Sequence, residues 1–196
     1  RDFAAALAAY RAAIAQASVA LGEAHPLVLE LSTYEAAALL ELGRNQAARE
    51  RLTAYLTAQD ASSRGATQRG VWPAIRLSRM DSALRRFTNA RALAERALAQ
   101  TPPDDLLTTI NAEAALADAL TDPDAALTRY RSILARCTTT YGAHDPITAA
   151  FQRRAAISQL RLARPEAATP LLHLALATGQ QVEPGLATTA ETHRLL

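Results

Sequence analysis

The sequence predicts an all-α protein built as an α-solenoid of stacked antiparallel helix pairs, and three observations carry this prediction. Alanine makes up about a quarter of the 196 residues, whereas glycine (7) and aromatic residues (5%) are scarce, which favours closely packed helices over sheets. Residues 6–57 align without a gap onto residues 126–177, at an offset of 120. Short polar turns that run into alanine also recur along the whole chain.

These turns define a repeat of roughly forty residues. Their last alanines are spaced 42, 42, 36 and 42 residues apart, and they are Ala6, Ala48, Ala90, Ala126 and Ala168. Apolar or small residues follow each alanine four and seven positions later, which places them on one face of a helix. One unit is therefore a helix, a tight turn and a second helix, and a lone pair of this kind cannot bury both of its apolar faces.

The predicted units follow one another as a single array over residues 1–196. They are a second helix over 1–22, helix pairs over 26–60, 68–100, 104–141 and 146–178, and a first helix over 183–196. Pro26 and Pro146 mark starts of first helices, where a missing N–H costs nothing, and Gly43 suits a left-handed cap. Because the chain begins and ends inside helical patterns, we expect it to be a fragment of a longer protein.

A small residue recurs inside each first helix. Ala36, Ala114 and Ala156 occupy this place in three repeats, and Ser78 occupies it in the fourth. A larger side chain would push the paired helices apart, so we expect these four residues to lie where the helices approach most closely.

The pattern of small residue, aliphatic residue, turn and alanine resembles the tetratricopeptide repeat (TPR). The 42-residue spacing and the segment 21–26 (LGEAHP) resemble the longer variety found in kinesin light chains and bacterial signalling proteins. Glu35 departs from the pattern, because such repeats usually carry an aliphatic residue there. The resemblance implies a scaffold that binds proteins or peptides, serving as the regulatory or sensory module of a larger bacterial protein such as a kinase or a transcription regulator.

Little in the sequence points to catalysis. The four histidines lack metal-ligand spacing, Cys137 is the single cysteine, and no phosphate-binding loop or nucleophile elbow occurs. We therefore predict that the protein is not an enzyme and uses no metal or cofactor. His25, in the turn before Pro26, is expected to hydrogen-bond the backbone.

The resemblance also implies a concave groove lined by the first helices of successive pairs. The register assigns to this groove Glu30, Thr33, Glu41, Trp72, Ile75, Arg79, Thr108, Asn111, Asp118, Arg153, Ile157 and Arg161. Trp72, the only tryptophan, is interpreted either as an exposed anchor for a peptide or as a filler between pairs. Asn111 could hydrogen-bond the backbone of an extended peptide.

Other partners remain as alternatives. The array could mediate self-association through an end pair. Residues 64–100 hold eight arginines against Asp81 and Glu95, which raises nucleic acid as a partner, but the net charge of the chain is only +2 and the flanking segments are acidic. No apolar run reaches the roughly 18 to 20 residues that span a bilayer, so we expect no membrane insertion. A cytoplasmic location is favoured, with a periplasmic one as the alternative if a membrane span precedes the fragment.

Replacing Ala156 with tryptophan tests the register. We expect the variant to melt at a lower temperature, because the larger side chain would separate the paired helices. Unchanged thermal melting, followed by circular dichroism, would count against the proposed alignment of the repeats.

Overall fold

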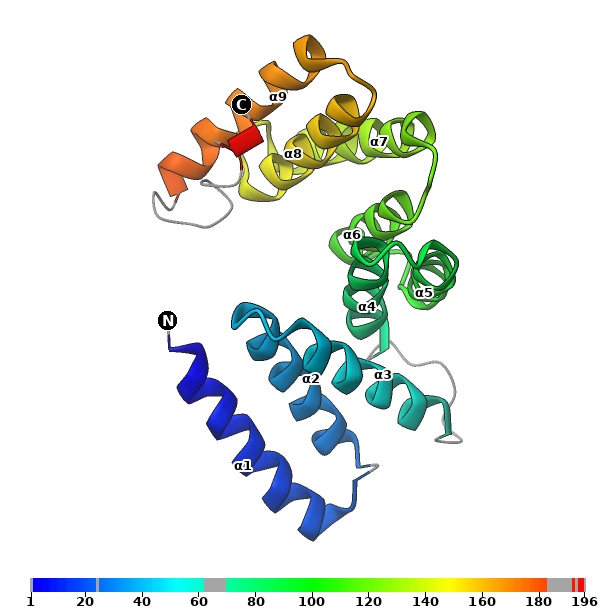
Figure 1. Cartoon of the computed structure of the whole chain (residues 1–196), viewed down its shortest axis with the longest axis vertical. Coiled ribbons are helices and arrows are strands. Elements are labelled where there is room, and N and C mark those ends of the chain that lie inside the picture. Colours follow the sequence, from blue (N-terminus) through cyan, green and yellow to red (C-terminus); the bar gives the residue numbers. More distant parts are fainter. Residues whose placement is uncertain (1, 24, 62–69, 183–191, 193, 196) are drawn as a thin grey trace. The chain divides into compact units, whose positions relative to one another are not determined.

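The fold is all-α, as predicted. The computed structural model describes residues 2–23, 25–61 and 70–182, together with 192, 194 and 195. Nine helices and no strand lie in these ranges (Figure 1). They are α1 (Phe3–Leu21), α2 (Pro26–Glu41), α3 (Asn45–Ala61), α4 (Val71–Ala83), α5 (Phe87–Gln100), α6 (Leu106–Asp118), α7 (Pro123–Tyr141), α8 (Pro146–Arg161) and α9 (Pro165–Val182).

The helices divide into two compact units, which are described separately. The first unit, Arg1–Ala119, contains α1 to α6, and the second, Leu120–Leu196, contains α7 to α9. Helices that follow one another in each unit pack together, and α4 also packs against α6. The predicted pair over 104–141 therefore contributes α6 to one unit and α7 to the other. Most of the predicted helix over 183–196 lies outside the described residues.

Three turns between helices have the same backbone. Gly43, Arg85 and Ala163 occupy equivalent repeat positions and have φ values of 69°, 59° and 54°. In each turn this residue donates its N–H to the carbonyl three residues earlier, and the next residue donates to the carbonyl five residues earlier. This pattern is the Schellman motif, which satisfies carbonyls left over at a helix end. The left-handed cap predicted at Gly43 is confirmed.

Helix starts follow the predicted chemistry as well. Pro26 and Pro146 stand in the first turns of α2 and α8. His25 Nδ1 accepts a hydrogen bond from the N–H of Leu27 at 3.2 Å, so its predicted bond to the backbone is confirmed. Asp145 holds the equivalent place before α8, where its carboxylate accepts from the N–H of Ile147 at 2.7 Å.

The predicted close-approach residues have no exposed surface. These residues are Ala36, Ser78, Ala114 and Ala156. The hydroxyl of Ser78 donates to the backbone carbonyl of Ala90 at 2.7 Å, which satisfies the one polar group in the set.

A buried carboxylate ties a first helix to its neighbours at two places. Glu35 of α2, 1% exposed, accepts from Arg11 Nε of α1 at 2.9 Å and forms an ion pair with Arg51 Nε of α3 at 2.7 Å. Asp81 of α4, also 1% exposed, accepts from Arg49 Nε of α3 at 2.8 Å, a bond that raises the pKa of Arg49. Paired guanidinium groups thus explain how Glu35 replaces the aliphatic residue expected there.

Helix α1 bears on the expectation that the chain does not insert into a membrane. Among the described helices it is the one with the length and mean hydropathy of a membrane span. A core helix or a signal sequence can share these two properties, and only 6% of the α1 window is buried. In the structure α1 packs on α2, buries Leu7 and carries Arg11, whose ion pair with Glu35 lies between the two helices.

The left-handed turn position offers a test with matched substitutions. Ala163→Gly should stabilise the chain by about 1 kcal/mol, because glycine adopts a positive φ without steric cost. Gly43→Ala should destabilise it by a similar amount, since open space surrounds the position and only the backbone conformation is penalised. Free energies of unfolding from urea titration measure both changes, and equal signs for the two variants would contradict the assignment.

Candidate functional site

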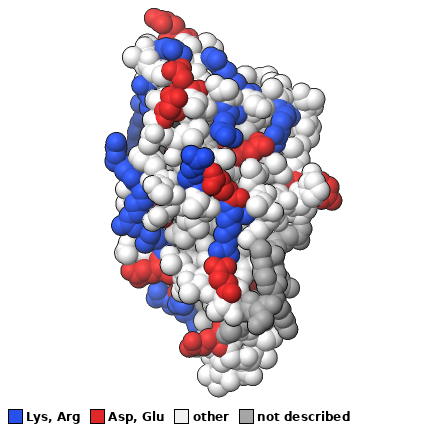
Figure 2. All heavy atoms as spheres, turned by 90° about the vertical axis from the view of Figure 1, so that its right-hand side faces the viewer, with Lys and Arg blue, Asp and Glu red and all other residues white. Residues whose placement is uncertain are grey.

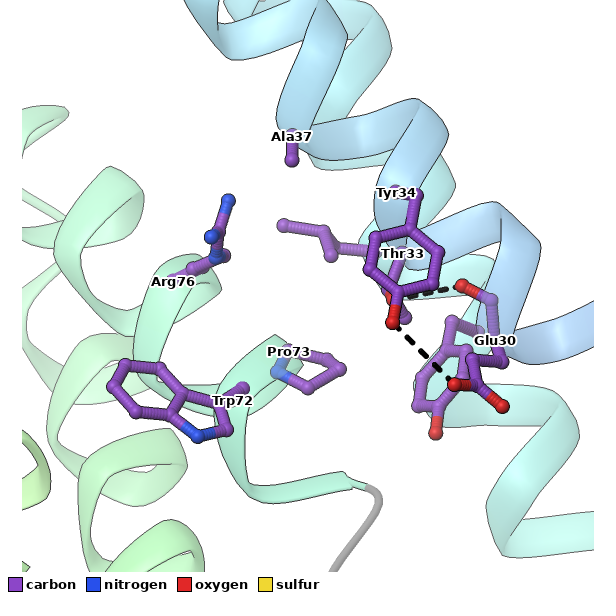
Figure 3. A pocket seen from close by; sticks show the side chains of 9 residues that line it. Glu30, Thr33, Tyr34, Ala37, Trp72, Pro73 and Arg76 are labelled. Carbon is purple, nitrogen blue, oxygen red and sulfur yellow. Dashed lines mark hydrogen bonds between the residues drawn. The ribbon is translucent and has the colours of Figure 1, made fainter. Parts of the chain in front are cut away.

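A cavity of about 440 Å³ opens between the first helices α2 and α4, and α3 forms part of its wall. Side chains of α2 lie on one side of it and those of α4 on the other (Figure 3). The lining residues are Glu30, Thr33, Tyr34 and Ala37 of α2, Leu52 and Tyr55 of α3, and Trp72, Pro73 and Arg76 of α4.

Helical spacing decides which side chains of α4 reach the cavity. Trp72 and Arg76 are four residues apart and share the exposed face of the helix. The opposite stripe is buried and consists of Val71, Ala74, Ile75 and Ser78. Trp72 is 41% exposed, so its indole is accessible at the edge of the cavity. Pro73 stands in the first turn of α4, where its missing N–H is tolerated.

The α2 wall is held in place by local contacts. Tyr34 stacks on Tyr10 of α1, with ring centroids 5.7 Å apart and an interplanar angle of 19°. Its hydroxyl also meets the Glu30 carboxylate at 3.4 Å, and the Thr33 hydroxyl donates to the backbone carbonyl of Glu30 at 2.8 Å. Tyr34 nevertheless remains 47% exposed. The cavity therefore has an aromatic wall that is already ordered and still accessible to a partner.

The two charged side chains of the cavity stand on opposite walls. Arg76 of α4 is exposed and makes no ion pair or hydrogen bond with any residue in the described ranges. Glu30 of α2 is also exposed, and its carboxylate forms no ion pair within the same ranges. Both charges are therefore available to a ligand.

Most other arginines of the basic segment have partners. Arg96 forms two hydrogen bonds with Asp60 at 2.8 and 2.6 Å, and Arg91 donates to Glu95 at 2.8 Å. The guanidinium of Arg85 lies 5.9 Å from the centroid of the Phe87 ring. On the face shown in Figure 2, basic and acidic side chains are interspersed. Among the described residues of this segment, most basic side chains are therefore paired and do not form a continuous basic track.

The predicted groove residues occupy several environments. Glu30, Thr33 and Trp72 line the cavity. Ile75 and Thr108 do not face a groove, because they are 0% and 5% exposed. Helical residues one position apart differ by about 100°, so the accessible side chain near Ile75 is Arg76, which the sequence analysis missed together with Tyr34.

Arg79 and Asn111 contact each other. The Arg79 guanidinium donates to the Asn111 side-chain oxygen at 2.9 Å, and the Asn111 amide donates to the carbonyl of Leu107 at 2.8 Å. Both ends of the asparagine amide are thus engaged inside the first unit, which leaves little capacity for a peptide backbone.

The remaining predicted residues stay predictions. Glu41 is exposed and Asp118 is half-buried, and neither lines the cavity. Arg153, Ile157 and Arg161 belong to α8 of the second unit. Arg161 is exposed there, whereas Arg153 and Ile157 are half-buried.

Two kinds of reactive site are relevant among the described residues, a metal site and a reactive cysteine. Within those ranges no group of three or more histidine, cysteine, aspartate or glutamate side chains is placed to hold a metal ion. Cys137 is buried, and this burial raises the pKa of its thiol, which disfavours the reactive thiolate.

Two arginines on α4 allow a structural role to be distinguished from availability to a ligand. Arg79→Ala should lower the free energy of unfolding by about 1–2 kcal/mol, because it leaves the bond between α4 and α6 unmade. Arg76→Ala should change it by less than about 0.5 kcal/mol, since Arg76 is exposed. Equal losses in the two variants, measured by urea unfolding, would contradict this distinction.

Comparison with known proteins shows which solved structures share this fold. No protein-family model matches the chain, and no curated protein matches it. Solved structures do. One crystal structure of nearly identical TPR-like repeats of kinesin light chain type, from Podosopora anserina, has a TM-score of 0.69 and 20% identity, covering 93% of this chain and 89% of that one.

Two further structures give the same result. A second crystal structure of the Podosopora anserina repeats has a TM-score of 0.66 and 20% identity, covering 92% of this chain and 89% of that one. BtubC (BKLC) from P. vanneervenii has a TM-score of 0.68 and 16% identity, covering 100% of this chain and 82% of that one. The chain therefore has the fold of the TPR-like helix-pair repeats of kinesin light chains.

Proposed function

We propose that the chain is a protein-binding repeat scaffold that captures a peptide segment of its partner in the cavity between α2 and α4. The observation that carries this proposal is the lining of that cavity, which combines the exposed aromatic rings of Tyr34 and Trp72 with the unpaired charges of Glu30 and Arg76. Aromatic and arginine side chains contribute most of the binding energy at protein interfaces.

The position of the cavity supports a peptide over a small metabolite. It lies between the first helices of two successive repeats, and the equivalent helix faces form an extended surface in proteins of this architecture. An extended chain can contact both helices at once and bury the half-exposed rings. By resemblance, such a scaffold would serve as the regulatory or sensory module of a larger bacterial signalling protein.

Self-association is a second candidate, and the surface of α1 favours it. Val19 is 91% exposed and Leu21 is 47% exposed, which gives this helix apolar surface that another copy could cover. Light scattering over a range of concentrations distinguishes the two functions, because a peptide-binding scaffold can remain monomeric at every concentration.

The peptide-binding function is tested by filling the cavity. A random peptide library displayed on phage should yield binders of the unaltered chain that are lost with Ala37→Trp, because the new side chain occupies the space next to Tyr34. Ala92→Trp on the exposed face of α5 is the matched control and should retain the binders. Binders that tolerate Ala37→Trp as well as Ala92→Trp would place the binding site elsewhere.

A further inference from the structure

The cavity between α2 and α4 carries one charge on each wall, and this arrangement selects its ligand. We infer that the preferred ligand is a peptide segment of mixed charge. An acidic residue of the peptide pairs with Arg76, a basic residue pairs with Glu30, and an apolar side chain between them enters the cavity. This inference rests on the proposed function and specifies the chemistry of the partner.

The first step of the argument is that these two charges differ from their neighbours. Arginine–carboxylate pairs occur throughout the first unit, as in Arg49–Asp81, Arg11–Glu35 and Arg96–Asp60. Glu30 and Arg76 face the same cavity but form no ion pair with each other or with any other side chain in the described part of the chain (Figure 3). Neither charge therefore has an ionic partner, although the Glu30 carboxylate accepts a hydrogen bond from the Tyr34 hydroxyl, and both charges are reachable from the cavity.

The second step concerns the surface between the two charges. No lining residue other than Glu30 and Arg76 is charged. Leu52 and Tyr55 are 0% and 5% exposed, so the wall supplied by α3 is deeply placed, and its one polar side-chain group is the Tyr55 hydroxyl. Such a wall favours an apolar side chain of the ligand over a charged one, because a charge there would lose hydration without a partner.

The third step excludes a ligand with charges of a single sign. A peptide with two acidic residues gains an ion pair with Arg76 but brings a carboxylate toward Glu30, which repels it. A peptide with two basic residues gains an ion pair with Glu30 but brings a positive charge toward Arg76. Only a mixed-charge segment meets an opposite charge on both walls. Because such a segment pairs at α2 and α4 together, it also spans two successive repeats.

Four blocked peptides of equal length test this inference. Each has a central leucine and no tryptophan, and the flanking residues are one arginine and one glutamate, two arginines, two glutamates, or two glutamines. Binding is followed by fluorescence, since Trp72 is the only tryptophan and lines the cavity. The mixed peptide should bind about two- to fivefold more tightly for each ion pair it gains over the glutamine peptide, and the gain should shrink at high salt.

Charge reversal of single residues should switch the preference. Arg76→Glu gives two acidic walls and should favour the peptide with two arginines, whereas Glu30→Arg should favour the peptide with two glutamates. Arg91→Glu, on the exposed face of α5, changes the net charge of the chain as much as Arg76→Glu and should leave the mixed peptide preferred. Circular dichroism confirms that each variant is folded.

The outcomes separate this inference from the proposed function. If phage-selected peptides bind in the cavity but the four peptides bind equally, the scaffold function holds and the mixed-charge inference is wrong. A preference for two glutamates that Glu30→Gln does not change would also overturn it, because Arg76 alone would then select the ligand. Loss of the phage-selected binders only in variants remote from the cavity would reject both.

Discussion

The architecture depends on how closely the paired helices approach. Ala36, Ser78 and Ala156 lie on the first helices of the packed pairs α2–α3, α4–α5 and α8–α9, and none has exposed surface. Dispersion contacts fall off steeply with separation, so the apolar residues of the second helix pack well only if these side chains stay small. Trp72 and Arg76, on the α4 wall of the cavity, belong to the exposed face of a helix whose opposite face is buried.

Much of the fold could be predicted because the same helix-pair pattern occurs several times in the sequence. The helix starts at Pro26 and Pro146 and the small residue inside each first helix recur along the chain, so each copy supports the others, whereas the cap at Gly43 is marked by its glycine alone. Glu35 needed the structure, because its two arginine partners come from different helices and no local pattern in the sequence joins them.

The site could be predicted only in part, since side-chain direction changes quickly along a helix. Trp72, Glu30 and Thr33 do line the cavity, but Ile75 turns into the core while its neighbour Arg76 faces outward. The bond between Arg79 and Asn111 spans 32 residues and leaves no trace in either helix alone. Spacing by four from Trp72 would have identified Arg76, whereas the stacking of Tyr34 on Tyr10 required the packing of α1 on α2.

The three left-handed turns show how such a chain can vary during evolution. Glycine, arginine and alanine occupy the same backbone conformation in these turns. The geometry of each turn is therefore imposed by the two helices that flank it, and not by the identity of the turn residue. Turn residues can therefore diverge at modest energetic cost. An insertion within a helix is different, because it would rotate every following side chain by about 100° and exchange core for surface. During evolution, the identity of the turn residues should therefore change quickly, whereas the length of each helix should change slowly.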